Sequence, residues 1–387
     1  MTVPLRAVIG AIVVCGAVVR LALHRGVTYS PADELVYARY SCRVAEEGLG
    51  SYPDLVQGYL ADPSAHVYPS PARWGFLLPD ALASSVLGCG PSAVAWVSTV
   101  AGIAMLVLVA VLAYRRFSPV VALVATAFVA SSPLQLLVGR RALGDGLVGL
   151  VAVAALWAIV VYLERRTWRR LAVAVLLVVA GFATKEIFFL FYPALLAPFV
   201  VAWVRARRVD PRDLLLLVLP PLLNAAVFAV LAGDVVAYAE VLRAIQSTVD
   251  APYPAEYMSG PPYRLVLDLV VLAPVVVLIA IAAHGLLLDR GTAASRMTAL
   301  LVVASVLPFG LVGAQVVRLV IATDTLVCLL AAWGLVTALR TRSRWWVGAV
   351  AAAAVAANCW VFWTLSIRHE VYDPVSDSLL RALGIIP

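Results

Sequence analysis

The 387-residue chain contains little charge and almost no lysine. Charged residues make up 13% of the sequence, about half of the roughly 25% that is typical of soluble proteins. Hydrophobic residues make up 63%, and the mean hydropathy is +0.98. This composition excludes a water-soluble enzyme and a disordered chain. Of the 29 basic residues, Lys185 alone is a lysine. The others are arginines, as expected of a GC-rich genome.

The motifs of the common cofactor sites are also missing. The sequence has no Walker loop, GxGxxG or HExxH pattern, and its four histidines are scattered. None of the five cysteines has a spacing that would indicate zinc. We therefore expect no cofactor, and no ligand cluster indicates a divalent cation. Cys42 and Cys89 both fall outside the apolar runs, and a disulfide between them in an oxidising compartment stays open.

Long apolar runs dominate what is present. Runs of about 17 to 24 residues match the length that crosses a bilayer core. The predicted fold is an all-α polytopic membrane protein, a single transmembrane domain over residues 1–387 with about eleven membrane-spanning helices. The predicted spans are residues 4–23, 92–114, 118–138, 144–163, 171–186, 187–204, 214–232, 265–288, 297–316, 318–339 and 345–366.

Arginines concentrate in every second loop between these spans. Because cytoplasmic loops carry an excess of Lys and Arg, the pattern predicts a cytoplasmic N-terminus and an outer C-terminus in a bacterial inner membrane. It also accounts for the net charge of +7 without a nucleic-acid partner. The arginines concerned are Arg115, Arg116, Arg165, Arg166, Arg169, Arg170, Arg205, Arg207, Arg208, Arg212, Arg290, Arg296, Arg340, Arg342 and Arg344.

Three segments are expected on the outer side. They are the first outer loop at 24–91, a second at 233–264 and a short tail at 367–387. Within the first loop, residues 31–47 have helical apolar periodicity after a potential N-cap at Ser30, which predicts an amphipathic helix along the membrane surface. The apolar stretch 74–88 is too short to span and is expected to be interfacial or re-entrant.

Asp33 and Glu34 begin that amphipathic helix. One interpretation of Asp33 is structural, as the acid of a capping box with Ser30. The other is catalytic, as a general base that accepts a proton from an incoming hydroxyl. The two are compatible. Glu34 points about 100° away on a helix and would orient the base or line the site.

Basic residues mark four further outer positions. Arg140 and Arg141 either reach lipid phosphates as snorkelling side chains or clamp a phosphate, with Asp145 holding an Arg or a substrate hydroxyl. A charge as deep as Lys185, between two short spans, is a functional candidate by default.

Arg264 and Arg318 begin the eighth and tenth spans. Each is a candidate for substrate contact or for pairing with Asp268 or Asp324, which lie inside those spans.

Five short motifs, in order along the chain and all on the predicted outer face, resemble the GT-C glycosyltransferases, above all protein O-mannosyltransferases and lipid A aminoarabinose transferases. Departures are the split proline pair at 69–71 and Glu186, where the family has glycine. The motifs are Asp33-Glu34 (Asp-Glu), Tyr68 to Trp74 (Pro-Pro-Leu-x-x-Trp), Gly139 to Asp145 (Ser-Arg…Asp), Ala183 to Glu186 (Thr-Lys-Gly) and Val317 to Val320 (Arg-Tyr).

This resemblance implies a membrane glycosyltransferase that uses a polyprenyl-phosphate sugar and inverts the anomeric carbon. It implies that Asp33 is the base and that the acceptor is a polar group on a protein, glycolipid or glycan. The phosphate would be held by basic residues, with Arg73 replacing a missing lysine and Tyr68 in the same motif. Those basic residues are Arg140, Arg141, Lys185, Arg264 and Arg318.

Other functions also fit the outer charges. A transporter or flippase for a phosphate-bearing lipid is the main alternative. A non-catalytic scaffold that binds a partner through the first outer loop, and a polymerase or ligase acting on lipid-diphosphate glycans, stay open as well. Each would sit among membrane lipids.

Overall fold

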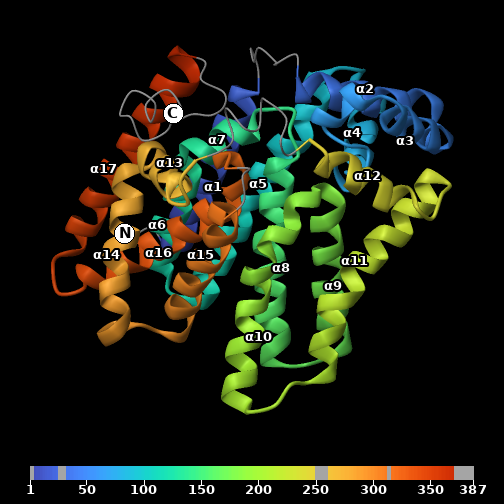
Figure 1. Cartoon of the computed structure of the whole chain (residues 1–387). Helices are drawn as coiled ribbons and strands as arrows, with labels where there is room; N and C mark the ends of the chain where they lie inside the picture. Colours follow the sequence, from blue (N-terminus) through green and yellow to red (C-terminus); the bar gives the residue numbers. More distant parts are fainter. Residues whose placement is uncertain (1–3, 25–31, 249–259, 312–314, 370–387) are drawn as a thin grey trace. The chain divides into compact units, whose positions relative to one another are not determined.

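The computed structural model describes residues 4–24, 32–248, 260–311 and 315–369, and these residues form helices without any β-strand (Figure 1). The predicted all-α fold is confirmed. The chain divides into two compact units, each assembled from separate stretches of sequence. The first unit comprises Met1–Arg25, Ala101–Gly139 and Tyr257–Pro387, and the second Gly26–Val100 and Arg140–Glu256. The predicted single transmembrane domain stays a prediction.

Most helices belong wholly to one unit, and α5 (Pro91–Arg116) contains the boundary. The first unit also holds α1 (Leu5–Leu23), α6 (Pro119–Ser131), α7 (Pro133–Gly139), α13 (Arg264–Leu272), α14 (Pro274–Arg290), α15 (Ala293–Leu311), η5 (Val317–Val320), α16 (Ile321–Ala338), α17 (Arg344–Phe362) and η6 (Trp363–Arg368). The second holds α2 (Asp33–Glu47), η1 (Leu49–Ser51), α3 (Tyr52–Ala61), η2 (Pro63–Val67), α4 (Trp74–Leu87), α8 (Asp145–Glu164), α9 (Trp168–Thr184), η3 (Glu186–Phe191), α10 (Tyr192–Ala206), α11 (Pro211–Ala232) and α12 (Ala237–Gln246).

Local sequence sets where several helices begin. Side chains of Ser118, Thr167 and Asp210 accept hydrogen bonds from backbone N–H groups of the first turns of α6, α9 and α11. Such caps satisfy donors that have no partner inside the helix. Gly233 ends α11 in the left-handed conformation (φ 68°) that favours glycine. These helix ends follow from residues that are adjacent in sequence.

Eight helical segments among the described residues are long and apolar enough to cross a membrane, or nine if the bent pair α6 and α7 is one span. The chain is therefore a multi-pass membrane protein. Each of the eleven predicted spans coincides with helical structure. However, α9 has only 17 residues, and prolines at 133 and 274 break two predicted spans into shorter helices, with a 54° bend between α6 and α7. The count of eleven stays a prediction.

Helix α16 forms the centre of the first unit. It packs against α6, α14 and α15, and its side chains are buried from Ile321 to Leu335. Its one charged residue, Asp324, accepts hydrogen bonds from Ser132 Oγ (2.8 Å) and Gln135 Nε2 (3.0 Å). The sequence predicted an arginine partner or a substrate contact for Asp324. In the structure its partners are instead a hydroxyl and an amide.

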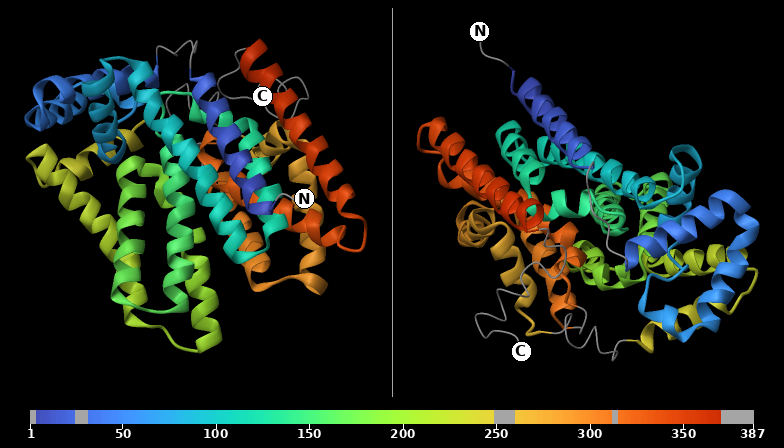
Figure 2. Two further views of the ribbon diagram at one scale, coloured as in Figure 1. Left: turned by 180° about the vertical axis from the view of Figure 1, so that it is seen from behind. Right: turned by 90° about the horizontal axis from the view of Figure 1, so that it is seen from above.

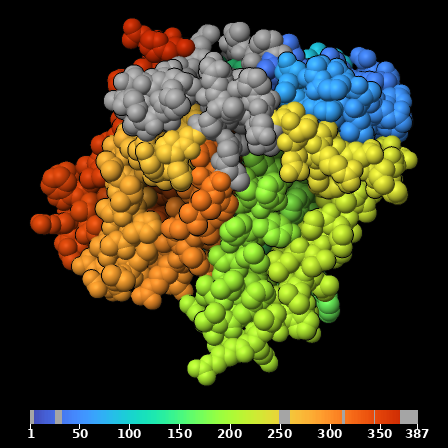
Figure 3. Space-filling model, in the orientation of Figure 1, coloured from blue at the N-terminus to red at the C-terminus, as the bar shows by residue number. Residues whose placement is uncertain are grey.

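In the second unit, α8, α9, α10 and α11 run side by side (Figures 1 and 2). The helices of the first outer loop gather at one end of this bundle, where α4 packs on both α2 and α9. Figure 3 shows α12 in yellow beside α3 in blue, and α12 also packs on η2. The end of the bundle where α8 starts and α9 stops is thus covered by the first outer loop.

Both helices predicted in that loop are present. The segment 31–47 forms α2, which starts at Asp33 after Ala32; the predicted cap Ser30 lies outside the described residues. The segment 74–88 forms α4, whose 14 residues are too few to span a bilayer. The loop also contains α3 and two 3-10 turns that the sequence did not predict.

A close helix contact in the first unit gives a test of the packing. A Cβ on Gly334 of α16 would lie 2.4 Å from Ala283 Cβ of α14, and neither atom belongs to a flexible side chain. Gly334→Ala should cost roughly 1–3 kcal/mol and lower the melting temperature of the detergent-solubilised protein.

Gly285→Ala on α14 is the matched control, because nothing lies within 4 Å of its added Cβ. It should melt at the wild-type temperature or above. Equal melting of the two variants would contradict this packing.

Candidate active site

Eight of the ten predicted site residues lie in the second unit. Arg264, fully buried at the start of α13, and Arg318 in η5 belong to the first unit. The eight are Asp33, Glu34, Tyr68, Arg73, Arg140, Arg141, Asp145 and Lys185. Five of them, with Glu186 and Tyr37, which were not predicted as site residues, form three ion pairs or bond directly to one. Two of these pairs are buried and the third is partly buried.

The first pair joins Glu34 of α2 to Arg141, which precedes α8. Arg141 donates from Nε (2.9 Å) and Nη2 (2.5 Å) to the two carboxylate oxygens, and the backbone N–H of Ala142 donates to Oε1 (3.0 Å). The Glu34 side chain is fully buried. This two-point contact fixes the plane of both groups. Arg141 is therefore turned inward, unlike a snorkelling side chain, whereas Arg140 is half-buried.

The second pair joins Asp145 to the single lysine of the chain. Lys185 Nζ lies 2.6 Å from Asp145 Oδ1, and both side chains are more than nine-tenths buried. Asp145 is the first residue of α8, where the helix dipole favours a negative charge. The sequence predicted an Arg or a substrate hydroxyl as the partner of Asp145, and the structure gives it Lys185.

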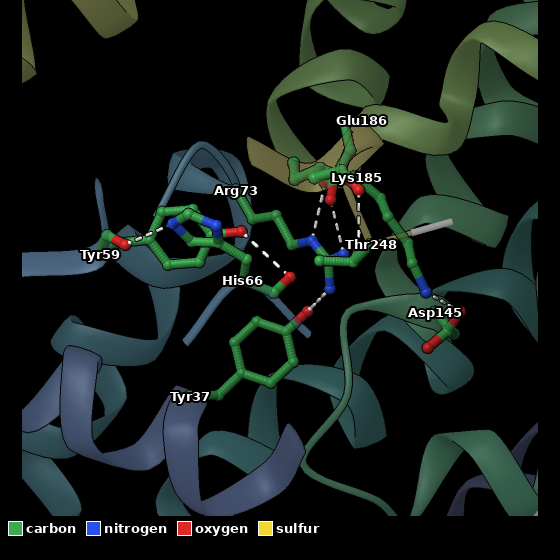
Figure 4. Close-up of polar contacts among 9 residues, drawn as sticks. Tyr37, Tyr59, His66, Arg73, Asp145, Lys185, Glu186 and Thr248 are labelled. Carbon is green, nitrogen blue, oxygen red and sulfur yellow. Dashed lines mark hydrogen bonds and ion pairs between the residues drawn. The ribbon is translucent and has the colours of Figure 1, made fainter. Parts of the chain in front are cut away.

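The third pair joins Arg73, in the loop before α4, to Glu186 at the start of η3. Arg73 Nε and Nη2 each lie 2.7 Å from a carboxylate oxygen of Glu186, and Nη1 donates to the hydroxyl of Tyr37 (Figure 4). The Tyr37 ring packs edge-to-face on Phe76, with centroids 4.9 Å apart. Burial raises the pKa of Tyr37, the charge of Arg73 lowers it and that of Asp33 raises it; the net shift is upward. The phenol therefore stays protonated at neutral pH.

The backbone at Lys185 separates the second pair from the third. Helix α9 ends at Thr184, and Lys185 adopts an extended conformation (φ −159°, ψ 126°). This extended residue interrupts the helical step of about 100° between α9 and η3, which begins at Glu186. Lys185 accordingly reaches Asp145 while Glu186 reaches Arg73 (Figure 4). A continuous helix, as predicted through residue 186, would have set these side chains only about 100° apart.

Two glycines permit the close approach of the elements that carry these pairs. A Cβ on Gly75 of α4 would lie 2.7 Å from Ala183 Cβ and 3.0 Å from the backbone nitrogen of Thr184. A Cβ on Gly181 of α9 would lie 2.3–2.5 Å from the ring of Phe188. The missing side chains let the start of α4 and η3 pack directly against the end of α9, next to Lys185.

Asp33 is half-buried at the first position of α2. Glu34, the next residue, is bonded to Arg141, and Tyr37, one turn later on the same face, is bonded to Arg73. The charge of Asp33 acts on the Tyr37 phenol. Asp33 thus lies beside two of the three ion pairs. Tyr68, by contrast, is 43% exposed at the end of η2.

Sequence reasoning missed the parts played by Tyr37 and Glu186. In the sequence, Glu186 departs from the glycine of the Thr-Lys-Gly segment, and a salt bridge with the adjacent Lys185 stays open. Tyr37 is an apolar position of the predicted helix and follows the Asp-Glu motif. The spacing of four between Asp33 and Tyr37 was the available signal. Among the described residues, no group of three His, Cys, Asp or Glu side chains could hold a metal ion.

Comparison with known proteins supports the resemblance. Residues 80–232, less than half of the chain, match the family model described as dolichyl-phosphate-mannose-protein mannosyltransferase. Among curated protein sequences, none matches this chain. The structure is similar to ArnT from Cupriavidus metallidurans bound to undecaprenyl phosphate, with a TM-score of 0.66 and 12% identity over 97% of this chain and 68% of that one.

Two further solved structures agree. The apo state of the same ArnT gives a TM-score of 0.56 and 15% identity over 97% of this chain and 67% of that one. The Archaeoglobus fulgidus oligosaccharyltransferase complex with Zn and sulfate gives a TM-score of 0.50 and 12% sequence identity. That match covers 97% of this chain and 57% of the other. The chain has the GT-C fold. The family match contains Asp145, Lys185 and Glu186, and together these findings support a GT-C membrane glycosyltransferase.

Breaking a buried ion pair of the candidate site should destabilise the protein far more than breaking a surface ion pair on the same helix. Glu34→Gln leaves the Arg141 charge buried without its carboxylate, which costs on the order of 3–5 kcal/mol. A thermal melt of the purified protein measures the loss.

Glu47→Gln, which removes the exposed contact with Arg43 on α2, is the matched control and should cost less than about 1 kcal/mol. If the two variants lose equal stability, the Glu34–Arg141 pair does not support the site.

Proposed function

We propose that this chain transfers a sugar from a polyprenyl-phosphate donor to an acceptor hydroxyl, with inversion, on the outer face of a bacterial inner membrane. The observation that carries the proposal is the set of three ion pairs in the second unit, two of which lie beside Asp33. The similar ArnT fold, solved with undecaprenyl phosphate, supports a lipid phosphate as the partner. The arginine-rich alternate loops support the orientation, with the N-terminus in the cytoplasm.

The basic residues of the pairs are suited to bind the phosphate of the donor. In a site that excludes most water, fixed cations stabilise a developing negative charge more strongly than they would in solution. Asp145 and Glu34 hold Lys185 and Arg141 in place before the donor arrives. Arg140 stays a further candidate, and the roles expected from the sequence for Arg264 and Arg318, which belong to the first unit, stay predictions. The leaving lipid phosphate then departs as a stabilised anion.

Asp33 is the proposed general base. The acceptor oxygen attacks the anomeric carbon, the bond from that carbon to the phosphate oxygen breaks, and Asp33 takes the hydroxyl proton. Glu34 is bound to Arg141 through both of its oxygens, so we assign it a positioning role. Because Glu34 directly follows Asp33, its ion pair with Arg141 fixes the first turn of α2 and thereby the position of Asp33. The acceptor is a polar group on a protein, glycolipid or glycan.

Asp33→Asn should reduce transfer about 10²–10⁴-fold, the usual contribution of a general base, without lowering the affinity for undecaprenyl phosphate. The measurement is release of free lipid phosphate from a panel of polyprenyl-phosphate sugars.

Asp54→Asn is the matched control for Asp33→Asn, because Asp54 is exposed and its carboxylate pairs with Arg43 at 3.2 Å; it should retain full activity. An Asp33→Asn protein that turns over at the wild-type rate would refute the base assignment.

Lys185→Gln should weaken binding of undecaprenyl phosphate about 10- to 100-fold, since a hydrogen bond to a charged group contributes about 1.5–3 kcal/mol. Titration of the lipid phosphate measures this effect separately from turnover. Arg208→Gln, at an exposed position in a predicted cytoplasmic loop, should leave the affinity unchanged. Unaltered affinity in Lys185→Gln would remove this residue from the phosphate site.

The same assay separates transferase from transporter. A flippase for a phosphate-bearing lipid would bind the sugar lipid without releasing free lipid phosphate. Release that requires both an acceptor and Asp33 supports the transferase.

A further inference from the structure

Two cysteines of the first outer loop meet at the surface of the second unit. Cys42 is half-exposed on α2, and Cys89 is exposed just after α4. The Cys89 thiol donates a hydrogen bond to Glu46 Oε1 (3.4 Å). Cys42 and Glu46 are four residues apart and therefore share one face of α2. The Cys89 sulfur therefore lies against the face of α2 that also carries Cys42, and the Cys42 thiol is the first cause of the raised pKa of Cys89.

The backbone around Cys89 suits a covalent link. Gly88 ends α4 with a φ of 90° and turns the chain back toward α2, while Gly90 has a φ of 148°. No atom lies within 4 Å of a Cβ built on either glycine. Ser41 and Ser84, one residue before Cys42 and one turn before Gly88, approach within 3.3 Å through their hydroxyls. The two helices are thus already held together where the thiols meet.

We propose that Cys42 and Cys89 form a disulfide that links α2 to the end of α4. The oxidant is a disulfide donor, either a protein or a small molecule. One cysteine thiolate attacks a donor sulfur and releases one donor thiol, and the second thiolate then attacks the mixed disulfide and releases the other. The two cysteine thiols are oxidised, the donor disulfide is reduced to two thiols, and the two protons end on those thiols.

The surroundings of Cys89 disfavour its thiolate. The neighbouring Cys42 thiol, burial and the hydrogen bond to Glu46 raise the pKa of Cys89 to about 12. Because the thiolate is the nucleophile, Cys89 attacks the donor slowly at neutral pH. Both side chains reach the surface, so the donor has access.

The bond would act on the candidate site. It closes a loop of about 48 residues, from 42 to 89, that contains Tyr68 and Arg73. Cross-linking a loop of this length lowers the conformational entropy of the unfolded chain and thereby stabilises the folded state. The bond also fixes α2, which carries Asp33 and Tyr37, against α4. In the cell, this disulfide requires that the first outer loop faces the outer side, as proposed above, because disulfides persist in oxidising compartments.

The test uses the purified full-length protein with oxidised glutathione as the disulfide donor. We expect Cys42 and Cys89 to lose maleimide reactivity together and to appear in one cross-linked peptide by mass spectrometry, while Cys15 still reacts. We also expect the melting temperature to rise on the order of 5 °C, with the rise reversed by dithiothreitol and missing in Cys42→Ser.

Full labelling of both thiols after oxidation, or glutathione retained on either without the cross-linked peptide, would overturn the proposal. Cys15→Ser is the matched control and should behave as the wild type. Because the test requires no sugar donor and no turnover, its outcome is independent of the proposed transferase activity.

Discussion

Charges buried away from water must be paired, and this constraint organises the second unit. A carboxylate or guanidinium left alone in a low-dielectric interior costs several kcal/mol. Here six such groups meet as three pairs within one region of the unit. The pairs connect the start of α2, the loop before α4, the start of α8 and the end of α9. The placement of these four elements and the charge arrangement of the site therefore depend on the same contacts.

The ending of α9 at Thr184 is what allows two of the pairs to form. Once Lys185 is extended, the chain sends adjacent charges to opposite sides, one toward α8 and one toward the first outer loop. Gly75 and Gly181 leave room for this turn. Arg73, which stands in for the lysine of the GT-C motifs, and Glu186, which replaces their glycine, are physically coupled, since the acid at 186 neutralises the arginine at 73. The positive charge of Arg73 is therefore already neutralised by Glu186, whereas a lysine without such a partner would keep its charge.

Much of the fold could be predicted because its causes are local. The apolar runs in the sequence coincide with the helical segments that could span the membrane. Side-chain caps set the first residues of several helices. The exceptions were also local in origin, at Pro133 and Pro274, where a ring without an N–H breaks the helical hydrogen bonds. The helices of the first outer loop followed from apolar periodicity at 31–47 and from the short apolar run at 74–88.

By itself, the sequence determined that the chain crosses a membrane many times, that it is helical, and which charged residues are chemically exceptional: Asp33, Glu34, Asp145 and Lys185 among them. It could not determine their partners. The paired residues are 40, 107 and 113 positions apart, and periodicity or hydropathy reports only on neighbours within a few turns. Only the tertiary structure decided that Lys185 pairs with Asp145 and not with the adjacent Glu186, because the direction of a side chain depends on where its helix stops and on which element packs there.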